Sequence, residues 1–171
     1  MPIILARVDE RLIHGQVALA WLKKYPIDMV IVIDDESAKD QLKTMLLKMA
    51  VSGTVKCEVV SLENAKDLIE KNNDKRIFLC SKSPIIYGEL IKQGVKIEDI
   101  NIGGIYAKDG RKQYYNTVFL TDEELMSIIE LENYETKVEY RMVPNDNEVD
   151  IIRDRKLRGR LWNLVLFKLY F

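Results

Sequence analysis

The chain has 171 residues, of which 47% are hydrophobic and 31% charged, a composition typical of one globular domain with a sizeable core. Its formal net charge of -1 argues against a nucleic-acid binder, because such proteins usually carry a strongly basic domain or patch. The N-terminal run MPIILAR has no basic segment before its apolar residues. It therefore predicts neither a signal peptide nor a membrane span, and the expected location is the cytoplasm.

Apolar runs of strand length alternate along the chain with segments of helical period. The runs cover residues 2–8, 28–34, 55–61, 76–80 and 99–104, and several are apolar on both faces, as in a parallel sheet covered on both sides. A helix is predicted over residues 15–25, with Trp21 on its apolar stripe. Further helix starts are indicated by caps at Ser37, Ser61, Ser83 (followed by Pro84) and the capping box TDEE at 121–124, and Gly94 fits the end of the helix that Pro84 begins. We expect a single-domain α/β fold, with an open, mostly parallel twisted sheet flanked by helices.

The two cysteines fall within strand-like runs. Cys57 lies in VKCEVV and Cys80 in RIFLC, and no CxxC motif or Cys/His cluster is present that would bind zinc. We expect buried free thiols rather than a disulfide, and neither a metal ion nor a cofactor.

The stretch RVDERLIHGQV, residues 7–17, holds the only histidine of the chain between the first predicted strand and the first predicted helix. Ligands of parallel α/β folds collect beyond the carboxyl ends of the strands, and a helix N-terminus favours anions. His14 as a nucleophile, with arginine and carboxylate neighbours, would suit phosphoryl transfer. In the plainer alternative His14 caps the helix or packs in a polar corner, and the charged neighbours form solvated pairs. Residue types alone favour that alternative.

The order of these residues changes that judgement. R-V-D-E-R-L-I-H-G-Q-V resembles the active loop of the IIB components of the sugar phosphotransferase system, mannose/fructose/sorbose family. The resemblance continues through DMVIVIDDESAKD, the loop CSKSP, INIGGI and the late run VPNDNEVDI, and so covers about residues 1–152. It implies a phosphotransferase IIB domain over residues 1–152.

In that family the histidine that matches His14 is a covalent relay. It accepts a phosphoryl group from a phosphohistidine of the IIA component and passes it to a sugar held by the membrane components IIC and IID. The resemblance therefore implies a cytoplasmic protein that associates with the inner face of the cell membrane through its complex. The resemblance implies phosphorylation on Nδ1, with Arg11 as the phosphate partner and Asp9 holding either the imidazole or the active loop. Gln16 is counted with the phosphate-binding residues.

Other positions carry weaker expectations. Arg7 either completes a positive rim for IIA or tethers the loop through a carboxylate such as Glu10. The paired glycines of INIGGI indicate a backbone turn, and only the resemblance suggests that Gly103 and Gly104 wall the active loop.

The loop CSKSP follows one strand and opens a helix, so Ser81, Lys82 or the backbone of the turn could reach the phosphate. The family more often has threonine or serine and then asparagine here, and Lys82 is a departure from that pattern. The plainer alternative is a Ser83-Pro84 helix start that binds no ligand.

Other functions fit the sequence less well. A histidine phosphatase or mutase needs a second histidine, and a dinucleotide enzyme needs a GxGxxG motif after the first strand, where DERLIHGQ stands instead. A non-catalytic binding or regulatory module of the same fold stays open as the alternative.

The stretch RDRKLRGRLWNLVLFKLYF, residues 153–171, lies beyond the resemblance. Its apolar run begins at Leu161 and has too few residues to span a bilayer as a helix, which needs about 20. It suits an anionic membrane surface or the membrane components, or alternatively forms a last element packed on the domain.

Overall fold

The structure, a computed structural model, describes residues 3–51 and 55–154. Its strands are β1 (Ile3–Asp9), β2 (Met29–Ile33), β3 (Lys56–Val60), β4 (Ile77–Ser81), β5 (Asp99–Gly104), β6 (Lys112–Tyr115), β7 (Val118–Leu120), β8 (Lys137–Tyr140) and β9 (Val149–Asp150). Its α-helices are α1 (Gly15–Lys24), α2 (Asp35–Lys39), α3 (Gln41–Ala50), α4 (Leu62–Lys71), α5 (Pro84–Lys92) and α6 (Asp122–Glu130), and a 3-10 helix, η1 (Leu131–Tyr134), follows α6.

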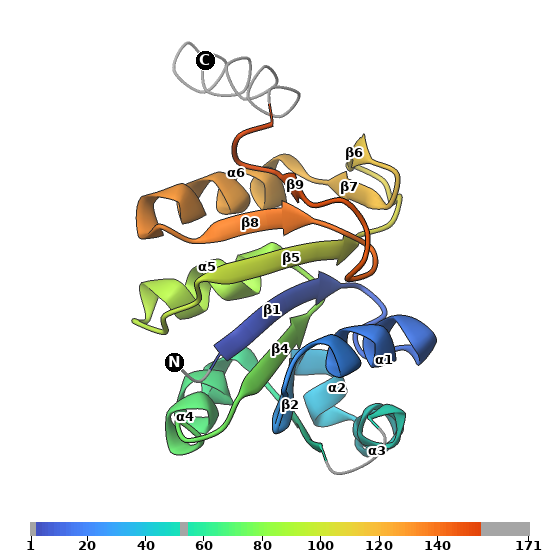
Figure 1. Ribbon diagram of the computed structural model, residues 1–171, viewed down its shortest axis with the longest axis vertical. Coiled ribbons are helices and arrows are strands. Elements are labelled where there is room, and N and C mark those ends of the chain that lie inside the picture. Colours follow the sequence, from blue (N-terminus) through green and yellow to red (C-terminus); the bar gives the residue numbers. More distant parts are fainter. Residues whose placement is uncertain (1–2, 52–54, 155–171) are drawn as a thin grey trace.

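The central sheet has the strand order β3-β2-β4-β1-β5-β8-β9. The strands from β3 to β8 are parallel to their neighbours, and the short β9 pairs antiparallel with β8. β1 lies between β4 and β5, so the loop after β1 emerges near the middle of the carboxyl edge of the sheet (Figure 1). The expected α/β fold with a mostly parallel sheet is confirmed.

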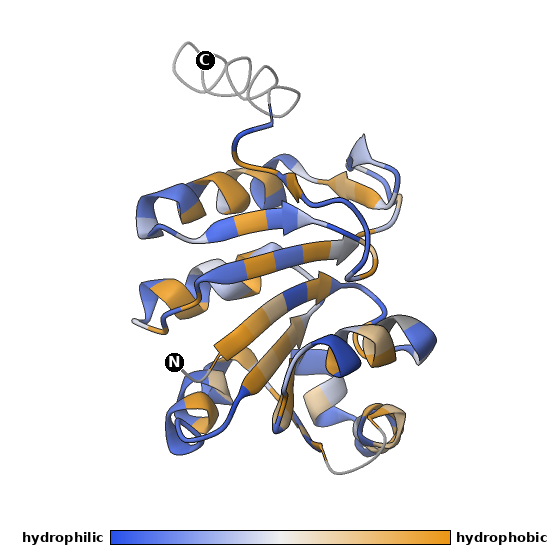
Figure 2. Ribbon diagram, in the orientation of Figure 1, coloured by the Kyte–Doolittle hydropathy of each residue, from blue (hydrophilic) through white to orange (hydrophobic). Residues whose placement is uncertain are grey.

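Helices cover both faces of this sheet. The core on one face includes Ala18 and Trp21 of α1 with Leu47 of α3, whereas Ile69 of α4 and Leu90 of α5 belong to the core on the other face. β2 and β4 are almost continuously apolar because both of their faces are buried, and β1 is apolar except at Arg7 and Asp9, while β5 and β8 alternate between apolar and polar residues (Figure 2). The polar positions of β5 and β8 lie on the same face as α1.

Most of the predicted helix boundaries are confirmed. Ser83 accepts a hydrogen bond from the N–H of Ile85 at the start of α5, with Pro84 as the first helical residue, and Gly94 follows that helix with a φ of 95°. Thr121 and Glu124 form the predicted capping box at the start of α6. Ser61 is the N-cap residue of α4, although its hydroxyl accepts a hydrogen bond from the side-chain amide of Asn64 rather than from a backbone N–H of the helix.

The cap predicted at Ser37 is wrong. Asp34 is the N-cap residue of α2, because its carboxylate accepts hydrogen bonds from both the backbone N–H and the hydroxyl of Ser37. Ser37 therefore lies within the helix, and Asp40 caps the separate helix α3 with a second carboxylate.

Both cysteines are buried free thiols, as predicted. Burial raises the pKa of Cys57 to about 11 and that of Cys80 further, so neither thiol ionises near neutral pH.

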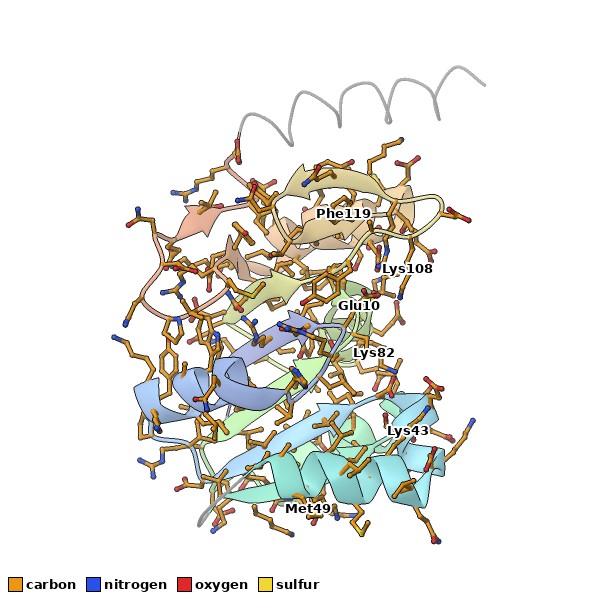
Figure 3. The ribbon with its side chains drawn as sticks, turned by 90° about the vertical axis from the view of Figure 1, so that its right-hand side faces the viewer. Glu10, Lys43, Met49, Lys82, Lys108 and Phe119 are labelled. Atoms are coloured by element: carbon orange, nitrogen blue, oxygen red, sulfur yellow. The ribbon has the colours of Figure 1, made fainter. Side chains whose placement is uncertain are left out.

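The outer side of α3 leaves Met49 and three other large apolar side chains, Leu42, Met45 and Leu46, exposed (Figure 3). Within residues 3–51 and 55–154, no helix has the length and apolar character needed to cross a membrane.

Candidate functional site

The loop after β1 is anchored at both ends. Asp9, the last residue of β1, is buried, and its Oδ1 accepts hydrogen bonds from the backbone N–H of Arg11 at 3.1 Å and from Arg11 Nε at 3.3 Å. Leu12 donates its backbone N–H to the carbonyl of Asp9 and adopts a φ of 57°, a left-handed conformation that costs about 1–2 kcal/mol. Burial of Leu12 and Ile13 in the α1-side core offsets this cost and directs the next residue outward.

His14 stands at the start of α1. It is the N-cap residue, with φ -140° and ψ 119°, and its carbonyl accepts the N–H of Ala18. Its side chain is exposed, as is that of Gln16, and the imidazole forms no hydrogen bond or ion pair with residues 3–51 or 55–154. No acidic residue lies in the first turn of α1, so the positive end of the helix dipole is not neutralised there. The histidine caps the helix with its backbone only and leaves its ring free for chemistry.

Arg11 lies in the loop of residues 10–14 between β1 and α1, the histidine loop, and its guanidinium is partly engaged. Nε contacts Asp9, the group lies 5.5 Å from the ring centre of Tyr106, and 36% of the side chain is exposed. Neither Nη atom donates to another group in the described part of the chain. The planar fork is therefore held at one end and can bind two oxygens of an anion at the other.

The structure agrees with one of the two expectations for Arg7, the tether through a carboxylate, and not with the other. Only 3% of its side chain is exposed, so it cannot form an accessible positive rim. It does tether the loop, but through Asp9 at 2.9 Å rather than through Glu10. Arg7 also donates to the side chain of Asn101, and a Cβ at Gly103 would overlap its guanidinium. Alternation along β1 explains this, because residues 7 and 9 point to the same face.

Glu10 instead contacts the loop that follows β5, at the same carboxyl edge of the sheet. Its carboxylate accepts hydrogen bonds from the backbone N–H of Tyr106 at 2.9 Å, from Lys108 at 2.6 Å and from Arg111 at 2.8 Å. Glu10 and Lys108 lie close together where Figure 3 views this edge. Burial by itself raises the pKa of Glu10, but these three donors outweigh it and lower the pKa overall. Arg111 also contacts Glu124 at 3.0 Å, which fixes this loop to α6.

The backbone turn expected at the paired glycines is wrong, because Gly103 and Gly104 both lie in β5 and neither has a positive φ. Their role is steric. A Cβ at Gly104 would lie 2.9 Å from the hydroxyl of Tyr106 and 3.3 Å from Oδ1 of Asp9, whereas at Gly103 it would meet Arg7. A side chain at either position would therefore force the groups that support the loop to shift.

In the CSKSP loop, the polar side chains of Ser81 and Lys82 bind other groups of the protein. The hydroxyl of Ser81 is buried and donates to the carbonyl of Ser83 at 3.0 Å. The ammonium of Lys82 contacts Asp34 at 2.9 Å and Glu36 at 3.2 Å (Figure 3 shows the position of Lys82). Burial lowers the pKa of Lys82, but these carboxylates outweigh it and raise the pKa overall. The structure thus agrees here with the Ser83-Pro84 helix start.

Several residues that support the histidine loop were not predicted from the sequence. The buried residues Asn101 and Glu139 and the partly buried Arg141 form a hydrogen-bonded polar group with Arg7. The available signal was an asparagine between the buried residues Ile100 and Ile102, because an isolated polar side chain on an inner strand needs a partner.

Comparison with known proteins gives a consistent result. The family model for the PTS system sorbose subfamily IIB component matches residues 3–157. The sorbose-specific EIIB component of Klebsiella pneumoniae is 34% identical over 154 residues, which cover 89% of this chain and 94% of that protein. The mannose-specific EIIAB component of Escherichia coli strain K12 is 33% identical over 156 residues, 89% of this chain and 48% of that protein. The crystal structure of the IIBSor domain of the Klebsiella pneumoniae sorbose permease superposes with a TM-score of 0.87 at 33% identity, covering 93% of this chain and 98% of that one.

Proposed function

Because the chain belongs to the sorbose subfamily of phosphotransferase system IIB components, we propose that it carries phosphoryl groups on His14 during sugar uptake. The donor in this proposal is the IIA component, and the acceptor is a sugar held by the membrane components IIC and IID. The single observation that supports it best is the exposed imidazole of His14 at the start of α1, in the same loop as the outward fork of Arg11.

The chemistry consists of two displacements at phosphorus. A ring nitrogen of His14, Nδ1 in our proposal, attacks the phosphorus of the IIA phosphohistidine; the new N–P bond forms as the N–P bond of the donor breaks. In the second step a sugar hydroxyl oxygen attacks the same phosphorus as the N–P bond to His14 breaks, and the hydroxyl proton ends on the departing ring, so that His14 leaves as neutral imidazole. In the first step the donor ring likewise takes up the proton that the His14 ring gives up. The phosphoryl oxygens carry negative charge throughout, so the protein stabilises both steps with fixed positive groups.

Each residue of the loop has a part in this scheme. Arg11 binds two phosphoryl oxygens through its Nη atoms, and the first N–H groups of α1, which include that of Gln16, face the same anion. Asp9 holds Arg11 and the loop backbone rather than the imidazole. Arg7 supports Asp9 from beneath the loop.

The remaining predicted residues act at a distance. Gly103 and Gly104 make room for Arg7, Tyr106 and Asp9. Ser81 and Lys82 receive no phosphoryl contact in this proposal, because their polar atoms already bind protein groups.

The docking face for IIA is the carboxyl edge around His14. Donor and acceptor must reach the same imidazole in turn, so each contact must be brief and of modest area. We place the protein in the cytoplasm, at the inner face of the membrane through its complex with IIC and IID.

The decisive experiment is phosphorylation in vitro. The protein is incubated with phosphoenolpyruvate, the general phosphotransferase proteins and the cognate IIA, and its intact mass is measured at alkaline pH, where phosphohistidine survives. We expect one phosphoryl group, located on His14 by peptide mapping and on Nδ1 by NMR of the ring nitrogens. If IIA binds but no phosphate is transferred, the protein is a non-catalytic binding module of the same fold.

A further inference from the structure

Three polar side chains lie side by side across the α1-covered face of the sheet. Arg7 of β1 is in register with Asn101 of β5, and Asn101 is in register with Glu139 of β8. Each of the three residues is at most 2% exposed. Two residues earlier on β1, on the same face, Leu5 belongs to an apolar core. On β1 the buried polar residues are thus confined to the end that carries the histidine loop.

Hydrogen bonds join this row into one chain that ends at the loop. Arg141 donates to both carboxylate oxygens of Glu139, each at 2.9 Å. Asn101 donates its amide to Glu139 at 2.8 Å and accepts a hydrogen bond from Arg7. Arg7 then donates to Asp9 at 2.9 Å. The carbonyl of Arg141 accepts further hydrogen bonds from Asn101 and Arg7, at 3.1 and 3.3 Å.

A second route connects the same segment to α1. The guanidinium groups of Arg7 and Arg141 lie 5.1 and 5.4 Å from the ring centre of Trp21. Trp21 is fully buried, and its Nε1–H donates to the carbonyl of Met142 at 3.2 Å. Because α1 begins directly after His14, residues 139–142 are linked to both anchors of the histidine loop, to Asp9 before it and to α1 after it.

Fold stability alone does not require this arrangement. Buried ion pairs lose their hydration, and apolar residues of similar volume usually stabilise a core at least as well. What a bidentate arginine and a fully bonded asparagine add is direction, because their hydrogen bonds fix the angles as well as the distances of the groups they join.

We propose that Glu139 and Arg141 are positioning residues for phosphoryl transfer, which set the histidine loop through Asn101, Arg7 and Trp21. This inference rests on the proposed function of His14. Neither residue touches the phosphoryl group. They orient Arg7, and through it Asp9, which in turn holds Arg11, while the contact with Trp21 holds the start of α1.

The first test replaces Arg141 by methionine, which keeps an unbranched side chain but removes the fork. We expect the kcat for phosphoryl transfer from phosphorylated IIA to fall about tenfold, with the KM for IIA unchanged because the docking surface is intact. The matched control is Arg76→Met. Arg76 directly precedes β4 and is another bidentate arginine, whose partner is Asp28. The control should transfer phosphate at the rate of the unmodified protein.

A double variant separates positioning from stability. Arg141→Met leaves the buried carboxylate of Glu139 without its main partner, so it lowers the melting temperature. Adding Glu139→Gln removes that charge and should recover part of the melting temperature, but not the rate. If the rate recovers together with the melting temperature, the residues are structural only and the proposal is wrong. The same conclusion follows if Arg141→Met transfers phosphoryl groups at a rate within twofold of that of the unmodified protein.

A third measurement does not depend on phosphoryl transfer. NMR of the unphosphorylated protein records the ring nitrogens of His14, Nε–H of Arg11 and Nε1–H of Trp21. In Arg141→Met all three signals should shift, and in Arg76→Met none should. Unchanged His14 and Arg11 signals in Arg141→Met would overturn the positioning role. Absence of phosphorylation in the unmodified protein, with these shifts present, would instead refute the proposed function alone.

Discussion

Replacing Arg11 by lysine keeps a positive charge in the histidine loop but removes the planar, forked shape of the guanidinium. The variant loses the hydrogen bond from Nε to Asp9, the cation–π contact of the guanidinium with Tyr106 and one of the two parallel donors of the fork. A hydrogen bond to a charged group contributes about 1.5–3 kcal/mol, and the lysine ammonium recovers part of that as a point charge. We therefore expect phosphoryl transfer to His14 to slow by about 10- to 100-fold, or roughly 1.4–2.7 kcal/mol in the transition state.

Rapid-quench measurement of transfer from phosphorylated IIA gives this rate directly. Arg76→Lys is the matched control, because it changes a bidentate arginine at the opposite edge of the sheet. The melting temperature of Arg11→Lys should change little, since its ion pair with Asp9 is partly exposed on the arginine side and such pairs contribute about 0–1 kcal/mol. A transfer rate within twofold of the unmodified protein would remove Arg11 from the mechanism.

Four further predictions follow from the same geometry. His14→Ala should abolish phosphorylation, measured by intact mass, and leave the circular dichroism spectrum unchanged, because the imidazole is exposed; a phosphorylated variant would contradict the assignment. Gly103→Ala should destabilise the protein by about 1–3 kcal/mol in urea unfolding, because its methyl group meets Arg7, and an unchanged midpoint would show that Arg7 can move aside. Glu10 has a lowered pKa in the folded state, so its contribution to stability is complete above its ordinary pKa of 4.5 and disappears as the pH falls through the folded value; Glu10→Gln should accordingly lower the melting temperature at pH 7 and progressively less below pH 4.5. A chain that ends after Ile152 should accept phosphate at close to the normal rate, and a folded truncated protein that is not phosphorylated would place the C-terminal stretch in the site.

The long buried strands were predictable because their apolar residues are continuous. β2 and β4 are buried along their whole length, and a helical period separates each such run from the next. The later strands were not predicted. β7 has three residues, β9 has two, and in β8 the charged residues Lys137 and Glu139 alternate with Val138 and Tyr140. Such short, mixed segments become strands only through their neighbours in the sheet.

For the candidate site, sequence order identified the loop but not the side chains beneath it. Residue spacing could not show whether Arg7 pairs with Asp9 or Glu10, because that depends on which side of β1 each residue faces. The partners of Arg7 at positions 101 and 141 are far away in the sequence and meet it only through the strand order. The predicted roles of residues 155–171 lie outside the described residues, and the domain boundary near residue 152 stays a prediction.

The position of β1 in the sheet has a consequence for synthesis on the ribosome. β1 is made first, yet its two neighbours are β4 and β5, and its residue Arg7 bonds to a partner 94 residues later in the chain. The carbonyl that receives the indole N–H of Trp21 is made 121 residues after it. Until those segments leave the ribosome, β1 has no neighbouring strands to pair with, and the nascent chain is therefore prone to misassociation. A polypeptide released before residue 142 therefore contains the histidine, but lacks the carbonyl of Met142 that binds Trp21 of α1.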